Sequence, residues 1–151
     1  MQKDVEEKLK KYARFETEQD IAKFDELLSQ ISEKRDPKFI PVLMEIFDDN
    51  TEFPEVMYTV VHALEYYPDE VHAKAVIESI PFMLSHAPNW LLRLIYAIFN
   101  ARSSLTLFKK YMHLIPKEPM FKLLGLVAQE SPNHRKLCLE LKKELLQEAK
   151  Q

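Results

Sequence analysis

The chain has 151 residues, of which 46% are hydrophobic and 30% charged, and its formal net charge is −3. This balance excludes a disordered chain, and the length is typical of one domain with a buried core, so we expect a single domain over residues 1–151. One glycine against nine prolines argues against sheets, whose tight turns need glycine, and predicts helices punctuated by proline.

The charge is distributed unevenly along the chain. Residues 1–36 have a net charge of −2, residues 37–72 a net charge of −7, and residues 73–151 a net charge of +6. Such asymmetry is typical of a surface that meets a charged partner, although solvated helix faces also show it.

The sequence also predicts where the protein resides. Cys138 is the only cysteine, so no intrachain disulfide can form, which favours a reducing compartment. No apolar run reaches the length of a membrane span, and the charged residues 1–11 do not resemble a secretory signal. We therefore expect a cytoplasmic protein without membrane contact.

The first predicted element is a cap over residues 2–34. Apolar residues recur at helical spacing through a first helix over residues 2–14. Thr17 then resembles the N-cap of a second helix, whose apolar stripe ends near Glu33.

Three antiparallel helix pairs are expected next, over residues 37–66, 69–101 and 103–130. Asp36 followed by Pro37 is typical of a helix start. The first helix of each pair contains an Ile-Pro step. Its proline is Pro41, Pro81 or Pro116.

The position of each proline predicts its effect. Pro41 is close enough to a helix start to be tolerated, whereas Pro81 lies deep in its helix and predicts a kink or a break. Pro116 is expected to end a helix near residue 114. A last helix over residues 132–150 has an apolar stripe and serves as a polar terminal cap. The stripe consists of Leu137, Leu141 and Leu145.

The second helices of the three pairs resemble one another. They begin at Pro54, Pro88 and Pro119, which are 34 and 31 residues apart. Each has a bulky residue two positions on and an alanine nine positions on. Repeated helices at this spacing predict an all-α fold, a short α-solenoid of antiparallel pairs with a capping helix or helices at each end. The matching positions are Val56, Trp90 and Phe121, and Ala63, Ala97 and Ala128.

Two resemblances follow from these residues. Helix pairs with a proline in the first helix and an acidic turn resemble HEAT-type repeats, at a shorter spacing than is usual for that class. More narrowly, residues 47–52, Val56-Met57-Tyr58, Asn89-Trp90 and Asn100 resemble immunity-protein family thirty, from bacterial polymorphic toxin systems, over about residues 20–130. This resemblance implies a small cytosolic protein of contact-dependent competition. Such a protein binds and neutralises one cognate toxin without catalysis.

Helical spacing separates a core face from an outer face in two of the second helices. The outer faces, with the acidic turn before the first of them, are expected to form one partner-binding surface. Tyr, Trp and Arg dominate binding hot spots, but Trp90 and Tyr96 would equally fill the groove between helices. The predicted binding residues are Asp48, Asp49, Glu52, Glu55, Tyr58, His62, Glu65, Trp90, Arg93, Tyr96 and Asn100.

No motif predicts catalysis, a metal or a cofactor. The five histidines form no HExxH pair, one cysteine excludes a cysteine-based zinc cluster, and the single Gly125 supplies neither a Walker loop nor GxSxG. The acidic turn, residues 48–52, lacks the EF-hand glycine and the terminal bidentate glutamate at their required spacing, which leaves a solvated turn or an anionic patch for a basic partner. Glu65 beside His62 is a pair that any helical protein offers.

The pattern bears on three candidate functions. The first is an immunity protein whose acidic segment captures a basic toxin, such as a nuclease domain. The second is a helical-repeat adaptor that binds a peptide or helix in a groove on the same predicted surface. The third, a HEAT-like DNA glycosylase, needs a basic concave face, whereas residues 37–72 contain one lysine. The basic residues after position 73 interleave with glutamates, so we expect no nucleic-acid partner.

Overall fold

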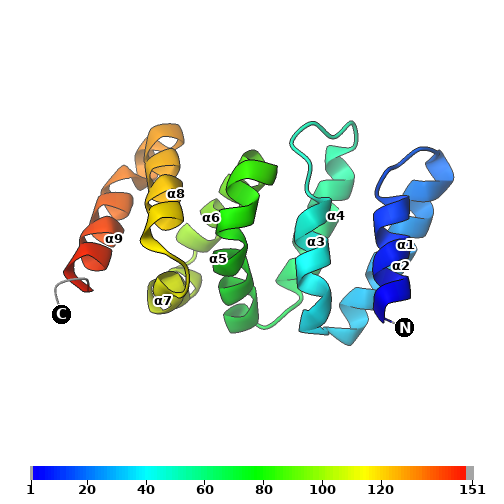
Figure 1. Cartoon of the computed structure of the whole chain (residues 1–151), viewed down its shortest axis with the longest axis horizontal. Coiled ribbons are helices and arrows are strands. Elements are labelled where there is room, and N and C mark those ends of the chain that lie inside the picture. Colours follow the sequence, from blue (N-terminus) through cyan, green and yellow to red (C-terminus); the bar gives the residue numbers. More distant parts are fainter. Residues whose placement is uncertain (1, 149–151) are drawn as a thin grey trace. The chain divides into compact units, whose positions relative to one another are not determined.

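The computed structural model describes residues 2–148, and its regular structure is helical (Figure 1). No strand is present among these residues, which confirms the predicted all-α class, whereas the solenoid arrangement stays a prediction. The α-helices are α1 Gln2–Tyr12, α2 Glu18–Lys34, α3 Ile40–Ile46, α4 Pro54–Glu65, α5 Asp69–His86, α6 Pro88–Phe99, α7 Arg102–Tyr111, α8 Lys117–Glu130 and α9 Arg135–Glu148. Short 3-10 turns lie at Pro37–Phe39, Met112–Leu114 and Pro132–His134.

The chain divides into two compact units, Met1–His72 and Ala73–Gln151, and each is described by itself. The first contains α1 to α4 and the start of α5, and the second contains the rest of α5 and α6 to α9. The expectation of one domain built from helix pairs and caps stays a prediction.

The start of α2 follows the predicted capping pattern. Thr17 Oγ1 accepts a hydrogen bond from the backbone N–H of Asp20 at 3.2 Å, and the Asp20 carboxylate accepts one from the Thr17 backbone N–H at 3.3 Å. This capping box satisfies two backbone donors that would otherwise lack partners at the helix start. The helix ends at Lys34, and Arg35 follows in the left-handed region with φ 49°.

Prolines open helical segments at Pro37, Pro54 and Pro88, where a missing N–H costs little. Pro81 does not break its helix, because α5 continues through it, and the expectation of a break was wrong. The neighbouring Ile80 is fully buried. Burial of this apolar face offsets the one backbone hydrogen bond that proline removes.

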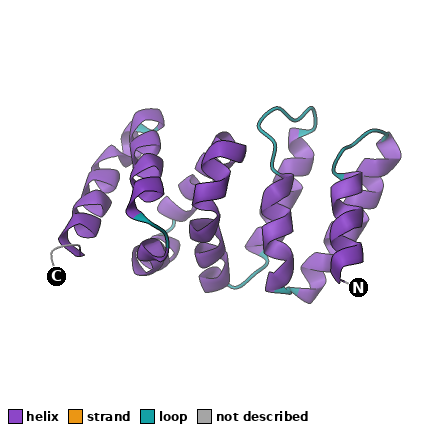
Figure 2. Cartoon of the chain, viewed as in Figure 1, coloured by secondary structure: helices purple, strands orange, loops and turns teal. Residues whose placement is uncertain are grey.

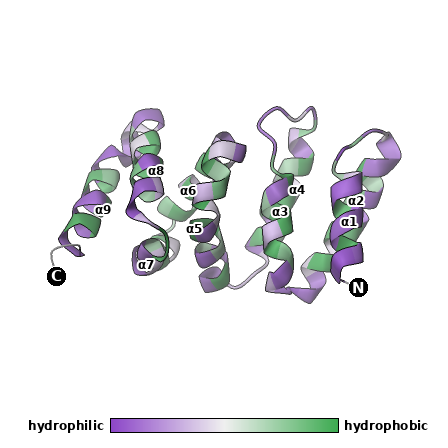
Figure 3. Ribbon diagram, viewed as in Figure 1, coloured by the Kyte–Doolittle hydropathy of each residue, from purple (hydrophilic) through white to green (hydrophobic). Residues whose placement is uncertain are grey.

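The core of the first unit lies between α1, α2, α3 and α4, which contact one another closely. Figure 3 shows both apolar and polar residues along the helices, and in α2 the buried residues Phe24, Leu28 and Ile31 recur at the spacing of an amphipathic helix. The largest buried side chains come from all four helices and from the residue after α3. They include Leu9, Phe24, Leu28, Leu43, Phe47, Met57 and Leu64.

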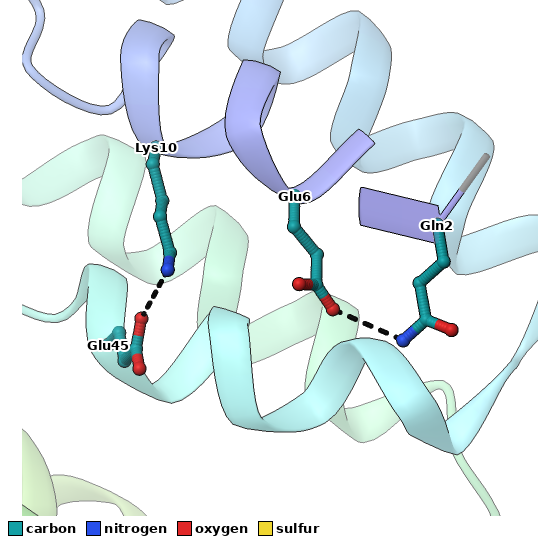
Figure 4. Close-up of polar contacts among 4 residues, drawn as sticks. All are labelled: Gln2, Glu6, Lys10 and Glu45. Carbon is teal, nitrogen blue, oxygen red and sulfur yellow. Dashed lines mark hydrogen bonds and ion pairs between the residues drawn. The ribbon is translucent and has the colours of Figure 1, made fainter. Parts of the chain in front are cut away.

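Two polar links join distant segments of the first unit. The Tyr67 hydroxyl donates a hydrogen bond to the backbone carbonyl of Asp36 at 2.8 Å. Burial, and then the Asp36 charge, raise the pKa of Tyr67. On the surface, Lys10 Nζ of α1 lies 3.2 Å from Glu45 Oε2 of α3 (Figure 4).

In the second unit, α6 packs on α7 and α8 packs on α9. Phe99 and Phe108 meet edge to face, with ring centroids 5.0 Å apart. Along α9, Leu141 and Leu145 are buried and Leu137 is half-buried, which agrees with the predicted stripe. The predicted helix end at residue 150 lies outside the described residues.

The repeat positions differ in burial. Of the three alanines, Ala63 is buried, Ala128 is half-buried and Ala97 is exposed. Of the three bulky residues, Val56 is buried, whereas Trp90 and Phe121 are half-buried. The sequence repeat is therefore not matched by equal environments, and its role in a solenoid stays a prediction. None of the described helices is both long and apolar enough to cross a membrane.

Candidate partner-binding surfaces

The helix α4 exposes the face that the sequence assigns to binding. Glu55, Tyr58, His62 and Glu65 are exposed. The opposite face is buried, as its spacing predicts. It consists of Met57, Val60, Val61 and Leu64.

His62 and Glu65 lie one turn apart on this exposed face. His62 Nδ1 is 3.5 Å from Glu65 Oε2, and at least half of each side chain is exposed to water. An exposed pair of this kind is weak. It also lacks the enclosed environment that tunes a catalytic acid and base, so the geometry supports a surface role.

The acidic turn is organised by its own side chains. The Asp48 carboxylate accepts a hydrogen bond from the backbone N–H of Asn50 at 2.8 Å, and Thr51 Oγ1 accepts one from the backbone N–H of Phe53 at 3.0 Å. Asp48 and Glu52 are exposed and Asp49 is half-buried. The turn therefore holds its carboxylates at the surface of the first unit.

The loop between α1 and α2 contributes residues that sequence reasoning missed. Phe15 has φ 49° and packs edge to face on Phe24 and Phe53, with centroid distances of 5.4 and 5.7 Å. This contact joins the loop to the acidic turn, and Figure 2 shows both loops at the same end of the unit. Arg14 and the turn line a hollow of about 320 Å³. No pattern in the sequence signals this contact.

A larger groove of about 460 Å³ lies between α2 and α4, with Arg35 and Tyr66 beside them. His62 is the only predicted binding residue that lines it. Sequence reasoning treated α2 as a cap and missed this groove. The residues that line it from α2 are Asp25, Leu28, Ser29, Ser32 and Glu33, and those from α4 are Thr59, His62 and Ala63.

The predicted residues of the second unit divide between exposure and internal contacts. Arg93 is exposed and Trp90 is half-buried. Tyr96 stacks on His134, with centroids 5.6 Å apart and planes at 9°. Burial, and then the charges of Glu130 and Cys138, raise the pKa of Tyr96.

His134 also ties Asn100 into the second unit. Its Nε2 lies 2.8 Å from Asn100 Oδ1, and its Nδ1 lies 2.7 Å from the Ser131 hydroxyl. Both bonds form if the imidazole is neutral with its proton on Nε2, because the hydroxyl then donates to Nδ1. Asn100 and Tyr96 thus help to hold the 3-10 turn before α9 against α6. No sequence pattern indicates this role for His134.

The predicted surface therefore falls into two groups. Seven of its residues, from Asp48 to Glu65, belong to the first unit, and four, from Trp90 to Asn100, belong to the second. That all eleven form one continuous surface stays a prediction. Among residues 2–148, no group of three or more His, Cys, Asp or Glu side chains is placed to hold a metal ion.

The division into units also divides the charge. The first unit has nine basic and eighteen acidic residues, a net charge of −9, whereas the second has twelve basic and six acidic residues, a net charge of +6. The first unit is thus a strongly acidic body whose carboxylates lie largely at the surface.

Comparison with known families shows which family this helical protein belongs to. It matches the family described as immunity protein 30 over residues 11–108, which is well over half of its length. The chain therefore belongs to the immunity protein 30 family. The matched region runs from the end of α1 into α7, and includes the acidic turn, the α2–α4 groove and Trp90. No significant match was found among curated proteins or solved structures.

Proposed function

We propose that this protein binds a cognate toxin and neutralises it by covering it with a complementary surface, without chemistry of its own. The acidic first unit makes the principal contact, and the toxin presents a basic surface there, as a nuclease domain would. Family membership supports a toxin as the partner. The net charge of −9 on residues 1–72 is the observation that carries the choice of surface.

The display of this charge supports rapid capture. Asp48, Glu52, Glu55 and Glu65 are exposed along the acidic turn and the outer face of α4. Like charges gathered on one body attract an oppositely charged partner over about a Debye length, roughly 8–10 Å at physiological salt. This attraction raises the association rate more than the affinity of the final complex.

The aromatic and arginine side chains supply the short-range contacts. Tyr58, with 36% of its surface exposed, lies among the carboxylates of α4. In the second unit, Trp90 and Arg93 are the residue types most often found at hot spots. Tyr96 and Asn100 contribute less to binding, because His134 engages both of them. We place this binding in the cytoplasm, where a lone buried thiol such as Cys138 stays reduced.

Charge reversal tests the proposal. The triple variant Asp48→Lys, Asp49→Lys, Glu52→Lys is expected to slow association with the toxin domain encoded by the neighbouring gene at least about tenfold at 50 mM salt. The loss should shrink at 300 mM salt, because exposed charges are then screened. Stopped-flow or surface plasmon resonance gives the rates, and co-expression gives rescue from toxicity.

A matched reversal in the second unit is the control. Lys109→Glu with Lys110→Glu changes exposed charges at the end of α7 and should leave the rate unchanged or raise it. Equal rates for the triple variant and the wild type at both salt concentrations would exclude the acidic turn as the contact. Failure of the wild type to bind or rescue would exclude the function itself.

A further inference from the structure

The groove between α2 and α4 has the dimensions of a binding site. Its volume of about 460 Å³ lies within the usual range for pockets that take a ligand or several side chains. On α2, the lining residues from Asp25 to Glu33 follow the spacing of one helix face and span about 12 Å at 1.5 Å per residue. The groove is therefore long enough for a short segment of a partner.

The floor of the groove is apolar. Leu28 and Ala63 lie beneath the groove and belong to the core, and with 1% and 4% of their surfaces exposed they offer a partner almost no surface. The hydroxyls of Ser32 and Thr59 donate to the backbone carbonyls of Leu28 and Glu55 in their own helices, so both are already satisfied. At the rim, Tyr66 has 59% of its surface exposed. The apolar surface open to a partner is therefore that of the Tyr66 ring, and tyrosine is a residue type enriched at protein-binding surfaces.

The two ends of the α2 wall differ in charge. At one end of this wall α2 contributes Asp25, whereas at the other end Glu33 and Arg35, which have opposite charges, both line the groove. Neither Asp25 nor Glu33 forms an ion pair within the described part of the chain. Partial burial raises the pKa of Asp25. Asp25 is exposed, and its negative charge gives this end of the groove a preference for a positively charged group.

We propose that the groove is the docking site for one segment of the toxin, which lays an apolar residue against the ring of Tyr66 and places an arginine or lysine beside Asp25. This inference rests on the proposed function. It adds a specific contact to the long-range attraction of the acidic unit, and it makes α2 part of the binding surface.

A small cation tests the groove without the toxin. The probe is n-butylguanidinium chloride, which has the head group and apolar stem of an arginine side chain. It is titrated into the isotopically labelled full-length protein at constant ionic strength, and amide chemical shifts are followed by NMR. We expect saturable shifts in residues 24–33 and 59–66. Shifts spread evenly over all acidic segments, the turn at 48–52 included, would overturn the groove as a site.

Matched variants locate the contact. Ser29→Phe fills the groove from an exposed position of α2, and it should weaken the probe at least fivefold, whereas Gln30→Phe, exposed but outside the groove, should not. Asp25→Asn should weaken it while Glu26→Gln leaves it unchanged. Equal binding by Ser29→Phe and Gln30→Phe would overturn the proposal.

The same pair of variants is then measured against the toxin domain. We expect Ser29→Phe to raise the Kd at least tenfold over Gln30→Phe. If both bind as the wild type does, the groove is not the docking site, although the proposed function stands. If the wild type binds the probe in the groove but does not bind the toxin, the proposed function fails and the toxin is excluded as the occupant.

Discussion

The two units of this protein differ in charge and in how their outward-facing residues are used. In the first, of net charge −9, the outer face of α4 and the acidic turn present carboxylates to solvent. In the second, of net charge +6, two of the four predicted binding residues are engaged by His134. The predicted outer face is thus exposed to solvent on α4, whereas in the second unit His134 contacts two of its four residues.

The units also differ in backbone conformation. Phe15 and Arg35, both in the first unit, occupy the left-handed region that favours glycine. The only glycine, Gly125, lies in α8 of the second unit at a helical position. The first unit therefore bears local strain beside its groove and hollow, where Arg35 and Phe15 lie. Strain of this kind costs about 1–3 kcal/mol per residue and concentrates at functional sites.

The largest effect should come from emptying a core. Phe24→Ala in the first unit and Phe108→Ala in the second remove fully buried rings, and each is expected to lower the free energy of unfolding by about 3–5 kcal/mol. Hydrogen exchange should show the loss from Phe24→Ala mainly in α1 to α4 and that from Phe108→Ala mainly in α6 to α9. Equal loss of protection in both units for either variant would break the division between them.

Removing His134 comes next. His134→Ala deletes the hydrogen bond to Asn100 and the stack on Tyr96, and should cost about 1–2 kcal/mol in urea unfolding. The neighbouring Asn133→Ala, at an exposed position, is the control. A cost no larger than that of the control would mean that the contacts of His134 with Tyr96 and Asn100 are not stabilising. The reason to expect a smaller contribution to binding from Tyr96 and Asn100 would then be lost.

Replacing the glycine of the second unit, and introducing a glycine at Arg35 of the first, should each be stabilising. A methyl group added at Gly125 meets nothing within 4 Å, so Gly125→Ala should raise the unfolding free energy by about 0.5–1 kcal/mol. Arg35→Gly relieves the left-handed strain and should also be stabilising, by up to about 1 kcal/mol. Thermal melting measures both. Destabilisation by Arg35→Gly would mean that the arginine side chain makes a stabilising contact.

The link between α1 and α3 should be weak. Lys10 and Glu45 are about half exposed, and a double-mutant cycle with alanine at each position should give a coupling of about 0.2–1 kcal/mol. The coupling should fall at high salt. A value well above this range would show that the pair is shielded from water and organises the first unit.

The smallest effect at neutral pH concerns His72, the last residue of the first unit. Burial lowers its pKa below the usual 6.5, against the opposing charges of Glu65 and Asp69. The unfolded chain thus binds a proton more readily, so stability is intact above pH 6.5 and is lost as pH falls through the window between the two pKa values. The melting temperature should drop more between pH 7.5 and pH 5 in the wild type than in His72→Gln. Parallel pH curves would contradict this assignment.

Much of the local structure is determined by the sequence alone. Helix starts follow from groups that satisfy or remove the first backbone donors, as at Thr17, Asp36-Pro37 and Pro88. Buried faces follow from the helical period, and the apolar residues Leu91, Leu94, Ile95 and Ile98 of α6 are buried at that spacing. The family, too, could be inferred from the acidic turn and the Trp90 helix, and the match over residues 11–108 confirms it.

Contacts between segments distant in sequence were decided only by the tertiary structure. Helical spacing assigns Tyr96 and Asn100 to an outer face, but it does not reveal that His134, more than thirty residues away, packs against them. Likewise, the sequence of α2 predicts only a cap, and the groove between α2 and α4 is seen only in the folded protein. Periodicity specifies which side of a helix is apolar. Which other segment contacts each side of the helix depends on how the helices pack.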